Sequence, residues 1–182
     1  MDETELNKLQ EEFIKDAFFR SAWLDTSQHV KIYKKEADEN TKKQFRAFLK
    51  KRSYEIVKDY QDKDEKIDHS KHLEFLQKFF DDVKKSEFKD KIDFSFGRAQ
   101  KLINVLLKYY WCAGKLKQEP AHMPLDRYIL NALGKKDKWT DMKEDAYKEC
   151  IDEAREKAKG MSLAEWELKT FTSKNDEGAP KN

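Results

Sequence analysis

Lys101, Asn104 and Lys108 form a polar stripe on a segment that is otherwise strongly apolar. Their spacing of i, i+3 and i+7 places them on one face of an α-helix. Such a stripe either meets solvent, with the lysine stems covering apolar surface, or lines a cleft. A partly buried lysine amine has a lowered pKa, and the neutral amine is nucleophilic. Lys101, which neighbours Leu102 and Val105, is the lysine for which this effect is expected.

An aspartate follows the apolar segment after a polar loop. Asp126 stands at the expected N-cap of the next helix, where a carboxylate accepts backbone N–H bonds and complements the helix dipole. Capping alone would account for an aspartate at this position.

The apolar periodicity is helical along the whole chain and predicts an all-α fold. We expect a single globular domain of seven to eight helices around a central apolar helix at 97–114. Before the central helix we expect a first helix ending near 25–27, a short one around 30–33, a long one that begins with a Thr41/Gln44 capping box, and one at about 73–83. After it we expect helices at about 126–133, 140–159 and 163–171. The last of these begins with a capping box of Ser162 and Glu165.

The length of 182 residues suits one domain, predicted to span 1–172, with a possible division into lobes 1–85 and 86–172. Aromatic residues make up 13% of the chain, enough large rings to form a core. Residues 173–182 are predicted to be a flexible tail.

The order of motifs between residues 96 and 171 resembles that of the helix-hairpin-helix DNA glycosylases. Gly97 and Arg98 precede a segment at 101–107 that is similar to the lysine-bearing helix of that family, and 124–130 is similar to its aspartate motif. A long helix followed by 160–166 resembles the C-terminal pattern of the smaller 8-oxoguanine glycosylases.

This resemblance implies a DNA-base glycosylase that acts through Lys101 and Asp126. Lys101 would attack the sugar carbon of a damaged nucleotide and form a Schiff base, and Asp126 would stabilise positive charge on the sugar. A flipped base would need a pocket. The implied pocket residues are Phe96, Asn104, Tyr109, Trp111 and His122, and the implied DNA contacts include Arg98 and Lys108.

The most basic surface is expected on the long helix, where Lys43, Arg46 and Lys50 share one face opposite apolar residues. The stripe could contact DNA phosphates or simply be a solvated helix face. The net charge is only +2, so any attraction to nucleic acid must come from such a local patch.

No motif for a cofactor or a metal is present, and the closely spaced His69 and His72 lack a further ligand motif.

An alternative function is a non-catalytic helical module that binds a protein or a nucleic acid. In that case Lys101 belongs to a solvated stripe and Asp126 is a helix cap. A helical RNA-cutting toxin is disfavoured, because Arg20 and His29 are too widely spaced. The sequence leaves open whether the chain is an enzyme, and it leaves the oligomeric state open.

The N-terminal segment has no basic region followed by an apolar run, so we expect no signal peptide. No stretch approaches the roughly 20 apolar residues of a membrane span. The two cysteines are not spaced as in a metal-binding or redox motif, so we expect both to be reduced thiols. These features predict a cytoplasmic protein with no membrane partner.

Overall fold

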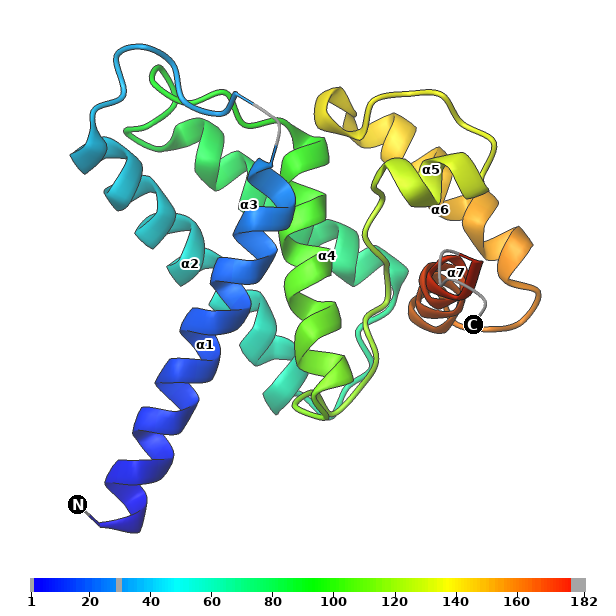
Figure 1. The fold of residues 1–182 in the computed structure, drawn as a ribbon, viewed down its shortest axis with the longest axis horizontal. Coiled ribbons are helices and arrows are strands. Elements are labelled where there is room, and N and C mark those ends of the chain that lie inside the picture. The colour runs from blue at the N-terminus through cyan, green and yellow to red at the C-terminus, as the bar shows by residue number, and fades with distance from the viewer. Residues whose placement is uncertain (1, 29–30, 178–182) are drawn as a thin grey trace.

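The computed structural model describes residues 2–28 and 31–177, and within them the fold is all-helical, as predicted. The elements are α1 Glu3–Ser27, α2 Glu39–Asp62, α3 His69–Lys85, α4 Phe96–Cys112, α5 Arg127–Ala132, a 3₁₀ turn η1 at Trp139–Asp141, α6 Glu144–Ala158 and α7 Leu163–Glu177. Helices α1 to α4 pack together, and α5 to α7 lie on the other side of α4 (Figure 1).

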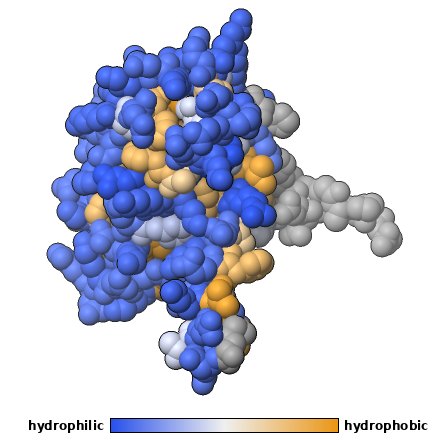
Figure 2. Space-filling view, turned by 90° about the vertical axis from the view of Figure 1, so that its left-hand side faces the viewer, coloured by the Kyte–Doolittle hydropathy of each residue, from blue (hydrophilic) through white to orange (hydrophobic). Residues whose placement is uncertain are grey.

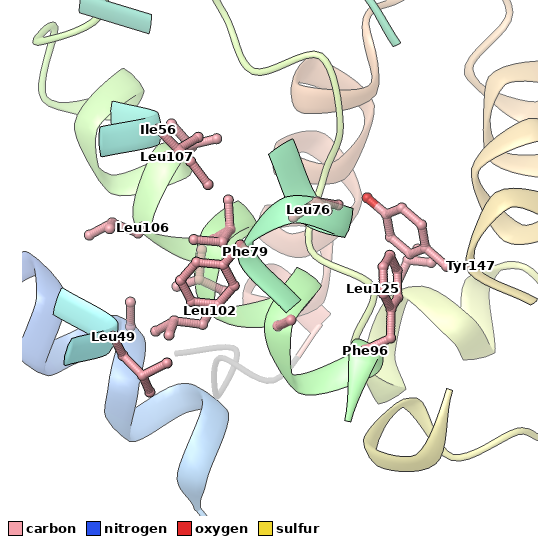
Figure 3. Packing of buried hydrophobic residues seen from close by; sticks show 14 of the residues in the cluster. Leu49, Ile56, Leu76, Phe79, Phe96, Leu102, Leu106, Leu107, Leu125 and Tyr147 are labelled. Carbon is pink, nitrogen blue, oxygen red and sulfur yellow. The ribbon is translucent and has the colours of Figure 1, made fainter. Parts of the chain in front are cut away.

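Helix α4 is buried along most of its length and contacts α1, α3, α6 and η1. Its apolar side chains meet those of α2 and α3, with Leu102 and Leu106 facing Leu49 and Phe79 (Figure 3). Buried residues from all seven α-helices belong to one hydrophobic cluster. A helix that is buried on several sides needs partners on each of them, and the fold provides them.

Several helix ends follow local capping chemistry. The Asp126 side chain caps α5, and Ser162 and Glu165 form the predicted reciprocal capping box at the start of α7. The expected cap at Thr41 is wrong. Asp38 caps α2 instead, and its carboxylate accepts a hydrogen bond from the Thr41 N–H at 2.7 Å.

Two other expected elements differ from the structure. Ile32 and Tyr33 are extended rather than helical, because the Asp93 N–H donates to the Ile32 carbonyl at 2.8 Å and Tyr33 bridges to Ile92. Val30, in the same expected helix, and His29 lie outside the described residues. The helix expected at 140–159 begins only at Glu144, because Trp139–Asp141 form the 3₁₀ turn η1, where the Thr140 carbonyl accepts a hydrogen bond from Ser95.

The C-terminal helix extends further than expected. Helix α7 continues to Glu177, into the segment expected to be a flexible tail, and residues 178–182 lie outside the described part of the chain. None of the described helices combines the length and the apolar character that crossing a membrane requires.

Candidate functional site

Lys101 lies at a cleft of about 930 Å³ between the end of α1, α4, α5 and η1. Its side chain is only 11% exposed. The cleft is lined by Asp25, Gln28, Lys101, Arg127, Asn131, Lys136, Asp137, Lys138, Trp139 and Thr140. A volume of this size suits a small-molecule ligand or a single nucleotide.

The Lys101 amine has two close neighbours, Asp126 and Trp139, and the sequence did not predict that both would lie beside it. Its Nζ atom lies 3.9 Å from Asp126 Oδ2 and 4.4 Å from the centre of the Trp139 ring. Burial lowers the pKa of the Lys101 amine below its usual value, while the carboxylates of Asp126 and Asp25 oppose part of this effect. The site therefore favours a neutral amine more than an exposed lysine does.

Asp126 uses its two oxygens differently. Oδ1 accepts hydrogen bonds from the backbone N–H groups of Tyr128 at 2.9 Å and Ile129 at 3.0 Å, which caps α5. Oδ2 is the atom nearest to Lys101. One side chain thus caps the N-terminus of α5 and places a negative charge beside the amine.

The two roles of Asp126 can be separated by substitution. Asp126→Ala should lower the free energy of unfolding by about 1 kcal/mol, because the cap is lost. Asp126→Asn should retain most of the stability, since its amide oxygen can cap the helix, but it should lower the Lys101 pKa further. Urea unfolding measures the first effect, and the pH dependence of amine acylation at Lys101 measures the second. Equal destabilisation by both substitutions would show that the ion pair, rather than the cap, supports the fold.

A set of buried hydrogen bonds holds the loop that carries Asp126. The Gln100 side chain pairs with both backbone groups of Leu125, donating to the carbonyl at 2.8 Å and accepting from the N–H at 3.1 Å. Asn104 Nδ2 donates to the Met123 carbonyl at 3.0 Å. Gln100 and Asn104 are one turn apart on α4, so the loop end is fixed against the helix that bears Lys101.

Asn104 and His122 belong to a buried chain of polar side chains rather than to the cleft. This hydrogen-bonded series links, in order, Tyr60, His72, Asn104, Tyr147, His122 and His69. The donor and acceptor atoms of each bond are 2.6–3.1 Å apart. Burial lowers the pKa of His72 to about 3 and that of His122 well below its usual value. Among the described residues, no group of three or more His, Cys, Asp or Glu side chains is arranged to hold a metal ion.

Asn104 sets the direction of these hydrogen bonds. Its Nδ2 donates to the Met123 carbonyl, so its Oδ1 accepts from His72 Nε2, and Nδ1 of the neutral His72 ring then accepts from the Tyr60 hydroxyl. Asn104 Nδ2 also donates to the Tyr147 hydroxyl, which donates to Nδ1 of the neutral His122 ring. His122 Nε2 in turn donates to His69 Nδ1.

The other expected pocket residues lie away from the cleft. Phe96 is buried in the core, with its ring against Phe80 and Tyr147. Trp111 is half-buried near the end of α4. The Tyr109 hydroxyl donates to Asp25 at 2.7 Å, so Tyr109 reaches the cleft through a carboxylate that lines it.

The expected DNA contacts do not form one surface with the cleft. The Arg98 guanidinium is buried and donates to the Asp93 carbonyl at 2.5 Å. Lys108 pairs with the Glu167 carboxylate at 2.8 Å and lies over the Phe171 ring, which anchors α7. On α2, Lys43 is exposed and Lys50 pairs with Asp16 of α1.

Arg46, also on α2, has its guanidinium 3.4 Å from the Tyr33 hydroxyl. None of the three α2 cations lines the Lys101 cleft. The cleft has its own cationic residues, Lys136 and Lys138 from the loop before η1 and Arg127 from α5. In the sequence, the high lysine content of that loop was the only indication that Lys136 and Lys138 form a cationic site.

Gly97 occupies the first turn of α4 and is packed against η1. Its N–H donates to the Met142 carbonyl at 3.0 Å, so this group is engaged within the fold and is not free to contact a phosphate. Trp139, the residue over the Lys101 amine, comes from this same 3₁₀ turn. The contact between Gly97 and η1 therefore helps to position the aromatic wall of the cleft.

Comparison with known proteins provides no further assignment. The chain matches no protein-family model, no curated protein and no solved structure. The function therefore has to be inferred from the geometry of the cleft.

Proposed function

We propose that the chain is a glycosylase-like protein that acts on a nucleotide in DNA through the Lys101 amine. The observation that carries this proposal is a buried amine with a lowered pKa, 3.9 Å from a carboxylate, at a cleft of nucleotide size. A lysine in such surroundings is suited to attack an electrophilic carbon.

Three cationic side chains besides Lys101 line the cleft, those of Arg127, Lys136 and Lys138. They stand against three carboxylates, Asp25 and Asp137 in the lining and Asp126 beside the amine, so the cleft has no net positive charge when the amine is neutral. Because the chain as a whole is also nearly neutral, contacts with phosphates would come from these three side chains individually. Trp139 offers an aromatic face on which a displaced base could stack.

The proposed reaction begins with the neutral amine. Lys101 Nζ forms a bond to C1′ of the sugar while the glycosidic C1′–N bond breaks. The base leaves with the electron pair and takes up one proton, and the amine loses one proton. Opening of the sugar ring then gives an imine between Nζ and C1′. Asp126 would stabilise the positive charge that develops on the sugar.

Borohydride trapping tests this proposal. The full chain is incubated with duplexes that contain an abasic site or one of a panel of damaged bases, and borohydride reduces any imine to a stable amine. We expect a protein–DNA adduct whose modified peptide contains Lys101. Lys101→Arg is the matched control, because it keeps the positive charge beside Asp126 and Trp139 but cannot form the imine.

Two results would reject a catalytic role. One is the absence of an adduct across the whole panel, and the other is an adduct that persists in Lys101→Arg or maps to another amine. Either result would favour the second candidate, a non-catalytic interaction module. The observation that favours this candidate is the double use of Asp126, whose cap on α5 explains its presence without any reaction.

A further inference from the structure

The N-terminal half of α1 projects from the body of the protein (Figure 1). Every residue from Asp2 to Phe13 is exposed, and the buried residues of α1 all lie in its C-terminal half. We call residues 2–16 the arm. The body bonds to the arm at its C-terminal end, where the Tyr54 hydroxyl donates to the Lys15 carbonyl and Lys50 pairs with Asp16. An isolated helix of this length is marginal in water.

The arm carries an apolar stripe that has no partner within the described residues. Leu6, Leu9 and Phe13 are 40%, 53% and 74% exposed, and their spacing of i, i+3 and i+7 places them on one face. The narrow projection at the bottom of Figure 2 shows apolar side chains where it joins the body. A groove of about 630 Å³, lined in part by Leu9, Phe13 and Ile14, runs beside the stripe.

Acidic side chains border this stripe. At 100° per residue, Glu5 and Glu12 lie along one edge of it and Glu3 along the other, while Asp16, on the first edge, already pairs with Lys50 of α2. Lys8 and Lys15, the only basic residues of the arm, fall on the opposite side of the helix. The arm holds six acidic and two basic residues in all, for a net charge of −4.

We infer that the arm is a docking site for a basic amphipathic helix of another protein. Such a helix would place its apolar face on Leu6, Leu9 and Phe13 and its lysine or arginine side chains against the acidic edges. A second copy of the arm would set acidic edges against acidic edges in either orientation. An anionic membrane surface would repel the same edges.

A designed peptide tests this assignment without knowledge of the natural partner. The probe is a dye-labelled 18-residue helix with leucines on one face and lysines elsewhere, titrated with the full chain near physiological salt. We expect micromolar binding by fluorescence anisotropy, and no binding of the same peptide with glutamates in place of lysines. Phe13→Ser and the double variant Glu5→Lys, Glu12→Lys should each weaken binding at least about tenfold.

Leu24→Ser is the matched control, because Leu24 is an exposed apolar residue of the same helix outside the arm. It should leave the affinity unchanged. All these positions are exposed, so the variants should remain folded, which circular dichroism checks. Equal binding of the glutamate peptide, or unchanged binding by the Phe13 variant, would overturn the inference. A dimer in sedimentation that Phe13→Ser dissociates, or binding of the arm to anionic vesicles, would assign the stripe to a different occupant.

Discussion

Lowering the pH from 6.5 to 5 should reduce the free energy of unfolding by about 3 kcal/mol, because His72 and His122 are buried as neutral imidazoles. The pKa of both side chains is lowered in the fold, to about 3 for His72, whereas an unfolded histidine titrates near 6.5. At pH 6.5 the unfolded chain therefore binds about one more proton than the fold, and the difference approaches two protons as the pH falls toward 5. Each proton contributes about 1.4 kcal/mol per pH unit, and the loss continues until the folded pKa is reached.

The direction of the hydrogen bonds explains why the fold resists these protons. His72 Nδ1 accepts a hydrogen bond from the Tyr60 hydroxyl, and His122 Nδ1 accepts one from the Tyr147 hydroxyl. A proton added to either nitrogen would set two donors face to face. The Tyr60 hydroxyl cannot simply turn its proton toward Ala121, because the N–H of that residue is also a donor.

Urea unfolding at half-unit steps between pH 7 and 5 measures the slope. His72→Gln and His122→Gln should each remove about half of it. His69→Gln should remove least, because that ring is half-exposed. In the wild-type protein, the ring resonances of His72 should not titrate in NMR spectra between pH 7 and 5. A stability that does not change in this range would contradict the neutral assignment.

Gly97→Ala should destabilise the fold by about 2 kcal/mol or more, because a Cβ atom at this position would lie 1.8 Å from the Trp139 carbonyl oxygen. The neighbour is backbone, so η1 as a whole would have to move. Helix propensity favours alanine by about 1 kcal/mol, which offsets only part of the strain. Displacement of η1 should also move the Trp139 ring away from the Lys101 amine.

Gly134→Ala provides the contrast. Gly134 has a φ of +79°, and nothing lies within 4 Å of the Cβ that would be added. Only backbone strain of about 1 kcal/mol is expected there. Urea unfolding compares the two stabilities, and the rate of Lys101 acylation reports the change at the cleft for Gly97→Ala alone. A Gly97→Ala protein as stable as the wild type would show that η1 is not packed as the structure has it.

The features that the sequence predicted depend on near neighbours in the chain. The Asp126 cap involves residues two and three positions away, and the Ser162 capping box spans four residues. The all-helical class follows from periodicity within single segments. The Thr41 prediction was wrong because two capping patterns overlap there, and Asp38 provides the one that the helix uses.

The features that the sequence did not predict depend on distant segments. Tyr33 is extended because Ile92 offers it a backbone partner, which no local pattern reveals. Trp139 reaches the Lys101 amine only because η1 docks on Gly97. The spacing of His69 and His72 indicated solvated side chains rather than a metal pair, whereas His72 is buried and His122 joins them from a loop 53 positions after His69.

The loop between α4 and α5 has a consequence for how this protein can vary. Surface loops usually tolerate insertions and deletions. Here Tyr60, Gln100 and Asn104 each bind a particular backbone group of the loop, at Ala121, Leu125 and Met123. A change in length between Ala121 and Asp126 would therefore displace these pairings from one another, so we expect this part of the loop to tolerate insertions and deletions less than its first half.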